Sequence, residues 1–195
     1  LWRIAQSGGP ETVNAMRVLA NQAHLTVPRA IAMRKLLEKL PETSDERRLS
    51  IVSGILRALP SERESIIGAE AARQHGRPFE ETATFIRWLA TNNEHERLLA
   101  LLPANQAIRS ADLFLPYVAA MEHTRRWKEL RDLIRKTPSI PIPPANSALI
   151  LARCAYSLKE SSEIVRGHLL DGLKRAWVTR DRPTTTSIGN AADEF

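Results

Sequence analysis

Two stretches of this chain, TFIRWLATNNEHERLLALL at residues 84–102 and PYVAAMEHTRRWKELRDLI at residues 116–134, decide the fold. In both, apolar residues recur at intervals of three and four, which is the spacing of one face of an α-helix. A short polar break divides each stretch into two helical segments. Helices this short, joined by only a few residues, pack as antiparallel hairpins. The two stretches therefore predict two copies of one helical hairpin.

The two copies match position by position, at a spacing of about 32 to 35 residues that is typical of helical-repeat proteins. The matched residues are Phe85 with Tyr117, Ile86 with Val118, Leu89 with Met121, His95 with Trp127, Leu98 with Leu130, Leu101 with Leu133 and Leu102 with Ile134. A third copy at residues 148–169 carries Leu151, Ala152 and Ala155 in its first helix and Ile164 in its second. The recurrence indicates stacked hairpins, because each hairpin leaves an apolar face that only a neighbouring hairpin can cover.

The rest of the chain shows the same rhythm of apolar periodicity and helix breakers. Glycine is scarce, at 8 residues, and the β-branched runs and tight turns typical of β-hairpins are missing, so the fold class is all-α. Helices are expected over residues 11–22, 27–39, 45–58, 61–74, 79–91, 94–102, 107–123, 126–136, 145–158 and 161–177. The Pro-rich stretch at residues 137–146 is expected to be an extended connector. Residues 178–195 are expected to form a polar C-terminal tail, mobile or laid along the last helices.

The pattern resembles the tetratricopeptide repeat (TPR), in which large, small and aromatic residues hold set positions and an aromatic residue opens the second helix. Phe114, Tyr117, Met121 and Trp127 occupy such positions. The chain departs from the family at several positions where the repeat has a small side chain. Larger residues stand there, namely Val118, Ile86, Leu130, Leu98 and Ile164. In this it is similar to divergent repeats of large uncharacterised bacterial proteins. The likeness is close over residues 80–177 and looser over residues 11–77.

The resemblance implies a right-handed α-solenoid of about five antiparallel helix hairpins within residues 1–177. The hairpins are expected near residues 11–39, 45–75, 79–102, 107–136 and 145–177. Aromatic side chains are expected to pack between hairpins, since each buries a large apolar area. These aromatic residues are Phe85, Trp88, Phe114, Tyr117, Trp127 and Trp177.

In the TPR-like arrangement, the first helices of the hairpins line a concave groove that binds a partner. The groove positions that the resemblance implies are Glu80, Arg87, Asp112, Glu122, His123, Asn146, Arg153 and Tyr156. Arg87 and Arg153 could together clamp a carboxylate, because a guanidinium group matches a carboxylate with two parallel hydrogen bonds. The sequence thus favours a non-catalytic interaction module or scaffold that binds a partner protein or peptide.

The charge leaves a second hypothesis open, since the net charge is +6 and the isoelectric point is near 10.0. Residues 18–40 resemble a helix-turn-helix, with a turn after Ala23 and His24 and a second helix carrying the basic residues Arg29, Arg34 and Lys35. His24 stands where that motif favours glycine. Basic and acidic residues otherwise alternate along the helices, which is typical of a solvated face. Nucleic-acid binding through residues 18–40 is therefore the alternative function.

Several other classes of function find no support in the sequence. The metalloprotease HExxH motif, the GxSxG elbow and the phosphate-binding P-loop are missing, so no enzymatic activity, cofactor or metal is expected. The single cysteine, Cys154, lies on an apolar face and is expected to be a buried thiol in a reducing compartment such as the cytoplasm. No apolar run is long enough to span a membrane, and residues 1–10 do not resemble a signal peptide.

The ends of a helical array are places where an apolar face can stay uncovered and drive self-association. Trp2 and Ile4 mark one such place in this sequence, and the region around Trp177 marks the other.

Overall fold

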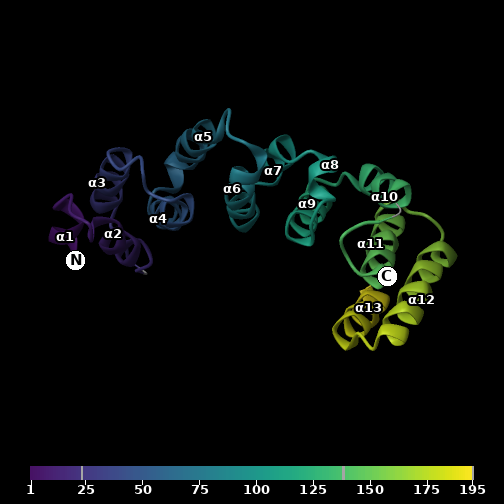
Figure 1. The fold of residues 1–195 in the computed structure, drawn as a ribbon. Helices are drawn as coiled ribbons and strands as arrows, with labels where there is room; N and C mark the ends of the chain where they lie inside the picture. Colours follow the sequence, from purple (N-terminus) through teal and green to yellow (C-terminus); the bar gives the residue numbers. More distant parts are fainter. Residues whose placement is uncertain (23, 138, 195) are drawn as a thin grey trace. The chain divides into compact units, whose positions relative to one another are not determined.

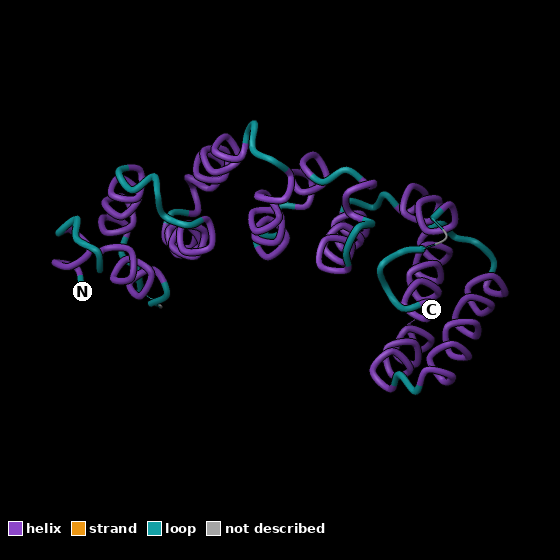
Figure 2. Tube along the Cα trace, viewed as in Figure 1, coloured by secondary structure: helices purple, strands orange, loops and turns teal. Residues whose placement is uncertain are grey.

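The computed structural model describes residues 1–22, 24–137 and 139–194, and over these residues the chain is all-helical, with 76% of it in helices. Figure 2 shows helices joined by loops, with no strand in the described part of the chain. The chain divides into two compact units, Leu1–Trp88 and the part from Leu89 onward. Ala23, in the predicted helix-turn-helix turn, and Pro138, in the predicted connector, lie outside the described residues. The prediction of an all-α fold is confirmed.

The first unit is built from short helices in chain order (Figure 1). They are α1 (Trp2–Gln6), α2 (Thr12–Ala20), α3 (Val27–Glu38), α4 (Asp45–Ala58), the 3₁₀ turn η1 (Pro60–Glu62), α5 (Arg63–Gln74) and α6 (Phe79–Thr91), whose last residues belong to the second unit. Asp45 and Glu46 occupy the first turn of α4, where negative charge stabilises the positive end of the helix dipole. Pro28 lies in the first turn of α3, where a missing N–H costs no helical hydrogen bond.

The core of the first unit centres on α4, against which α2, α3 and α5 pack. The approach of α2 is so close that a Cβ atom on Gly54 would lie 2.3 Å from the carbonyl oxygen of Ala20. Only glycine fits at this position. The Arg57 guanidinium donates a hydrogen bond to the same Ala20 oxygen at 2.9 Å, which satisfies a carbonyl that the end of α2 leaves without a helical donor.

A buried ion pair ties α3, α4 and α5 together. Arg48 donates from Nε and Nη2 to the two carboxylate oxygens of Glu70, at 2.8 Å each, and from Nη1 to the Leu37 carbonyl at 2.9 Å. The two side chains are only 6% and 5% exposed. The bidentate geometry and the third hydrogen bond satisfy charges that would otherwise be buried without partners.

Aromatic residues of α6 attach that helix to the core of the first unit. Phe85 is fully buried, and its ring stacks on Trp88 at a centroid distance of 5.5 Å. Trp88 Nε1 donates hydrogen bonds to the Ser53 hydroxyl at 2.7 Å and to the Leu49 carbonyl at 3.1 Å. The predicted packing role of these two aromatic residues agrees with their burial.

The second unit continues the series of short helices. They are α7 (His95–Leu101), α8 (Ala104–Ala107), α9 (Ala111–His123), α10 (Trp127–Lys136), α11 (Pro144–Ser157), α12 (Ser162–Thr179) and α13 (Arg182–Glu194). Helix α9 packs against α7, α8 and α10, and α10 in turn packs against α11. Helices α11, α12 and α13 lie side by side and share one core (Figure 1). The buried residues of that core are Ala145, Leu149, Ala152, Ala155, Val165, Leu169, Ala176, Ile188 and Ala191.

The same turn occurs four times in the described part of the second unit, and three of the four lie between the two helices of a predicted hairpin. Asn93, Arg125 and Lys159 have φ angles of 60°, 58° and 58°, in the left-handed region. In each turn the next N–H donates back to a helix carbonyl, namely Glu94 to Leu89, Arg126 to Met121 and Glu160 to Ala155, each at 2.9 Å. This hydrogen bond belongs to the Schellman motif, which closes the C-terminus of a helix.

The described residues from 178 to 194 are mostly helical, which the predicted polar tail did not include. Helix α12 continues to Thr179, and residues Arg182–Glu194 form α13, which packs on α11 and α12. Asp181 starts α13, because its carboxylate accepts hydrogen bonds from the Thr184 backbone N–H at 3.1 Å and from the Thr184 hydroxyl at 2.6 Å. The apolar stripe of α13 is too narrow to stand out in the sequence, but it is buried, with Ile188 at 0% exposure.

Other expectations need local corrections. The helix predicted over residues 107–123 is α9, which begins only at Ala111, and a separate short helix, α8, occupies Ala104–Ala107 before it. In the third copy, Ile164 is 44% exposed while Val165 is buried, so the sequence match in the second helix is wrong by one residue. Helix α10 begins two residues after its turn residue Arg125, whereas α12 begins three residues after its turn residue Lys159. This difference shifts the buried face of α12 by one residue. Trp177 is 79% exposed, so its predicted packing between hairpins is also wrong.

Candidate peptide-binding surface

An ion pair between α9 and α11 forms the centre of the candidate surface. Arg153 on α11 approaches Glu122 on α9, with 3.6 Å between Nη1 and Oε1. The Arg153 side chain is 44% exposed and that of Glu122 is 20% exposed. Burial raises the pKa of the Glu122 carboxyl, and the positive charge of Arg153 acts against that rise. The pair joins α9 to α11 and presents a guanidinium group to solvent.

Two large exposed side chains lie on the same helix faces as the two members of this ion pair. Tyr156 lies one turn beyond Arg153 on α11, on the same helix face, and is 48% exposed. Leu115 on α9 is 49% exposed and lies two turns before Glu122 on the same face. Sequence reasoning did not select Leu115. Its position three residues after Asp112, a predicted groove residue, was the signal that could have found it.

A stacked pair of histidines borders the surface. The rings of His95, at the start of α7, and His123, at the end of α9, lie parallel within 5°, with centroids 4.3 Å apart. Burial lowers the pKa of His95, the nearby His123 lowers it further, and Glu94 partly opposes both effects. His95 Nδ1 is buried and accepts or donates no hydrogen bond within the described residues. His123 was a predicted groove residue, whereas His95 was not.

Two predicted groove residues of the second unit have different surroundings. The side-chain amide of Asn146 contacts the Thr184 hydroxyl oxygen at 2.8 Å, so this side chain holds α13 against α11. The sequence analysis predicted Asn146 as a groove residue without α13. In the structure, Thr184 of α13 contacts the Asn146 side chain. Asp112 lies exposed in the first turn of α9, on the face of Leu115.

The predicted groove residues of α6 lie in the first unit. Glu80 and Arg87 share one exposed face of that helix, and Arg87 donates a hydrogen bond to the Thr84 hydroxyl at 3.4 Å. Arg153 belongs to the second unit. The carboxylate clamp of Arg87 with Arg153 stays a prediction.

The basic residues of the alternative nucleic-acid site are partly engaged within the first unit. Arg34 donates to Glu62 at 2.6 Å and to Ser65 at 3.1 Å, which neutralises its charge locally. The Arg29 guanidinium lies 5.9 Å from the centre of the Trp2 ring, in a cation–π contact. Lys35 is exposed. Among the described residues, only Arg34 of these three is paired with an acidic side chain, and nucleic-acid binding through residues 18–40 stays a prediction.

The remaining reactive groups are enclosed or dispersed. Cys154 is buried, and burial raises the pKa of its thiol to about 12, so the nucleophilic thiolate is scarce at neutral pH. Within the described parts of the chain, no three His, Cys, Asp or Glu side chains gather closely enough to hold a metal ion. Among the same residues, no helix is long and apolar enough to cross a lipid bilayer.

Comparison with known proteins gives no relative from which a site could be transferred. No protein-family model, curated protein or solved structure matches this chain. The properties of the surface centred on Glu122 and Arg153 therefore follow from its own geometry.

Proposed function

We propose that this chain is a divergent TPR-like α-solenoid, and that it serves as a non-catalytic module binding a peptide segment of a partner protein. The observation that carries the proposal is the recurrence of one turn at Asn93, Arg125 and Lys159. Each of these three turns joins the two helices of one predicted hairpin, with a residue in the left-handed conformation and the same hydrogen bond, and this recurrence supports one structural unit used repeatedly.

The packing order within each unit supports the repeat. Helix α4 packs against α3, its neighbour in sequence, and also against α2, the helix before that. Helix α13 does the same with α12 and α11. Contacts with both the preceding helix and the one before it are expected when antiparallel hairpins stack in a solenoid.

The chemistry of the surface suggests the kind of peptide that binds. We define this surface by Leu115, Glu122, Arg153 and Tyr156. Arg153 offers a guanidinium group that can exchange its long contact with Glu122 for a bidentate contact with a peptide carboxylate. Tyr156 offers apolar area one helical turn from Arg153, and Leu115 offers more apolar area two helical turns from Glu122 on α9. The proposed ligand is an extended segment with an acidic residue next to a large apolar one.

Selection from a displayed random-peptide library, with the purified chain as bait, tests this function. The enriched peptides should share an acidic residue adjacent to an apolar one. Fluorescence anisotropy with a synthetic peptide should show that Arg153→Met and Tyr156→Ala each weaken binding by about tenfold or more, the size expected for central interface residues. The matched controls are Arg175→Met and Ile164→Ala, which alter exposed residues of α12 that do not line the cavity beside Tyr156.

Two outcomes would refute the proposal. One is a selection that enriches no common motif. The other is a peptide whose affinity is unchanged in the Arg153 and Tyr156 variants, because that peptide would bind elsewhere. Circular dichroism of each variant separates lost binding from lost folding.

A further inference from the structure

The junction of α12 and α13 carries two strongly exposed apolar side chains. Trp177 is 79% exposed and Val178 is 82% exposed, whereas their neighbour Ala176 is fully buried in the core that α11, α12 and α13 share. Ala176 therefore anchors the end of α12 and leaves the next two side chains facing solvent. Water contact with two adjacent large apolar side chains is unfavourable, and such patches commonly mark a binding surface.

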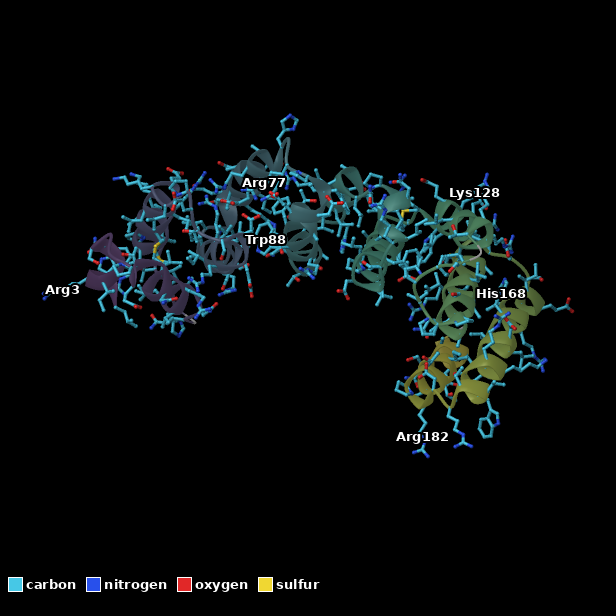
Figure 3. The ribbon with its side chains drawn as sticks, in the orientation of Figure 1. Arg3, Arg77, Trp88, Lys128, His168 and Arg182 are labelled. Carbon is cyan, nitrogen blue, oxygen red and sulfur yellow. The ribbon has the colours of Figure 1, made fainter. Side chains whose placement is uncertain are left out.

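Basic residues surround these apolar side chains. Lys174, Arg180 and Arg182 are exposed, and among the described residues no acidic side chain forms an ion pair with any of them. Figure 3 shows Arg182, the first residue of α13, at the junction with α12, with its side chain pointing away from the ribbon. Asp181, the acidic residue between the two arginines, is already hydrogen-bonded to Thr184. The junction therefore presents an excess of positive charge.

The backbone of the junction places Trp177, Val178, Arg180 and Arg182 close together in sequence at the end of α12, with Lys174 one helical turn earlier. Arg180 has a φ of 55°, and the Asp181 N–H donates to the Ala176 carbonyl at 2.9 Å, so the turn is closed by the same type of hydrogen bond as the repeat turns. An open cavity of about 540 Å³ lies at this turn. Its lining residues are Ala176, Trp177, Arg180, Arg182, Thr185 and Thr186. Two guanidinium groups beside an indole ring are suited to an anionic phosphate group.

We propose that the basic tip, defined as Lys174, Trp177, Val178, Arg180 and Arg182, docks on an anionic membrane surface. Trp177 and Val178 enter the boundary between headgroups and acyl chains, where tryptophan is favoured because its ring is apolar and its N–H is polar. The three basic side chains contact lipid phosphates. Apolar insertion and electrostatic attraction together give reversible peripheral binding, which neither contribution supplies alone.

The apolar pair distinguishes a membrane from the other polyanion, a nucleic acid. A base can stack on Trp177, but Val178 has no planar face and gains little from a polynucleotide. Both side chains gain when they leave water for a lipid interface. The exposed valine beside the tryptophan therefore favours lipid as the occupant.

Vesicle sedimentation of the whole chain tests this inference. Vesicles of phosphatidylcholine with phosphatidylserine should retain the chain, and vesicles of phosphatidylcholine alone should retain much less of it. Trp177→Ser with Val178→Ser should lower the partition coefficient by about tenfold or more, because both inserted side chains are lost. Arg180→Asn with Arg182→Gln should lower it by about tenfold or more through the lost cations. Asn suits position 180, because it tolerates a positive φ.

The controls lie on the same helix, far from the tip. Ile164→Ser with Arg166→Gln changes one exposed apolar and one exposed basic residue of α12 and should leave the partition coefficient unchanged. Brominated lipids should quench tryptophan emission in the wild-type chain and quench it less in the Trp177→Ser variant. This optical measurement reports insertion directly and does not depend on the peptide-binding surface.

Several results would overturn the inference. Equal retention by neutral and anionic vesicles, no retention by either, or retention unaffected by the tip variants would each exclude a role for the tip in lipid binding. Binding of an oligonucleotide that depends on the tip, without vesicle binding, would assign the surface to nucleic acid instead. A dimer that dissociates in the Trp177→Ser variant and does not bind vesicles would assign it to a second copy of the chain.

Discussion

Arg125 and Lys159 adopt the same left-handed backbone conformation, each with a φ of 58°, in two successive turns of the second unit. Neither residue type favours this region, because the Cβ atom crowds the following carbonyl. The conformation is kept because the Schellman hydrogen bond behind each turn closes a helix whose buried face is already fixed by packing. The backbone of each turn is therefore slightly strained, because the residue there is not glycine, which would adopt this conformation without strain.

Replacing either residue with glycine should stabilise the chain. Arg125→Gly and Lys159→Gly should each raise the free energy of unfolding by about 0.5 kcal/mol, since glycine removes a strain of about 1 kcal/mol but has more freedom in the unfolded chain. Thermal unfolding followed by circular dichroism measures the change. Arg166→Gly, in the interior of α12, is the control and should lower the stability by about 1 kcal/mol. Destabilisation by all three changes would contradict a left-handed conformation in the turns.

Two glycines in helices of the first unit should respond to alanine in opposite ways. Gly54→Ala should destabilise the unit by about 1–3 kcal/mol, because the new methyl group would meet the Ala20 backbone of α2. At Gly68 in α5, an added methyl group would meet no atom within 4 Å, so Gly68→Ala should stabilise by about 0.5–1 kcal/mol through helix propensity. Urea denaturation distinguishes the two. A stabilising Gly54→Ala would show that α2 and α4 do not approach each other this closely.

The ion pair of Arg48 and Glu70 should be costly to break from one side. Glu70→Leu leaves the Arg48 charge buried without its partner and should cost about 3–5 kcal/mol of unfolding free energy. The double variant Arg48→Met with Glu70→Leu should recover most of this loss, because no buried charge remains. Chemical denaturation of the three proteins gives the comparison. If the single and double variants are equally unstable, the ion pair is solvated rather than buried.

The stacked histidines should make the second unit less stable in mild acid. Burial and His123 lower the pKa of His95 below 6.5, so the unfolded chain binds a proton more readily than the folded chain does. Stability is therefore fully present above about pH 6.5 and is lost as the pH falls through the lower pKa of the folded state. Burial also lowers the pKa of His168, which contributes in the same direction.

Unfolding free energies compared at about pH 7.5 and about pH 5.5 measure this effect. The difference should be smaller in His95→Gln than in the wild-type chain. His24, which shows no such stack, provides the control variant His24→Gln. An unchanged pH dependence in His95→Gln would mean that His95 titrates like an exposed histidine.

Sequence periodicity determined the helical character of this protein and many of its helix boundaries. The helices expected over residues 45–58 and 79–91 are α4 and α6 with the same bounds. Leu98 and Leu130, matched in the two best copies, are both fully buried. Helix formation and the identity of an apolar face depend on neighbours within a few turns, so a single sequence carries that information.

Only the tertiary structure decided which faces are covered and which polar groups meet. The short apolar stripe of α13 forms a helix because Asp181 caps it and Ile188 finds a core between α11 and α12. Trp177 is large and apolar, yet it lies exposed because Ala176 takes the buried position beside it. The contact of Glu122 with Arg153 joins two separate helices. Such outcomes depend on residues distant in the chain, which local periodicity does not encode.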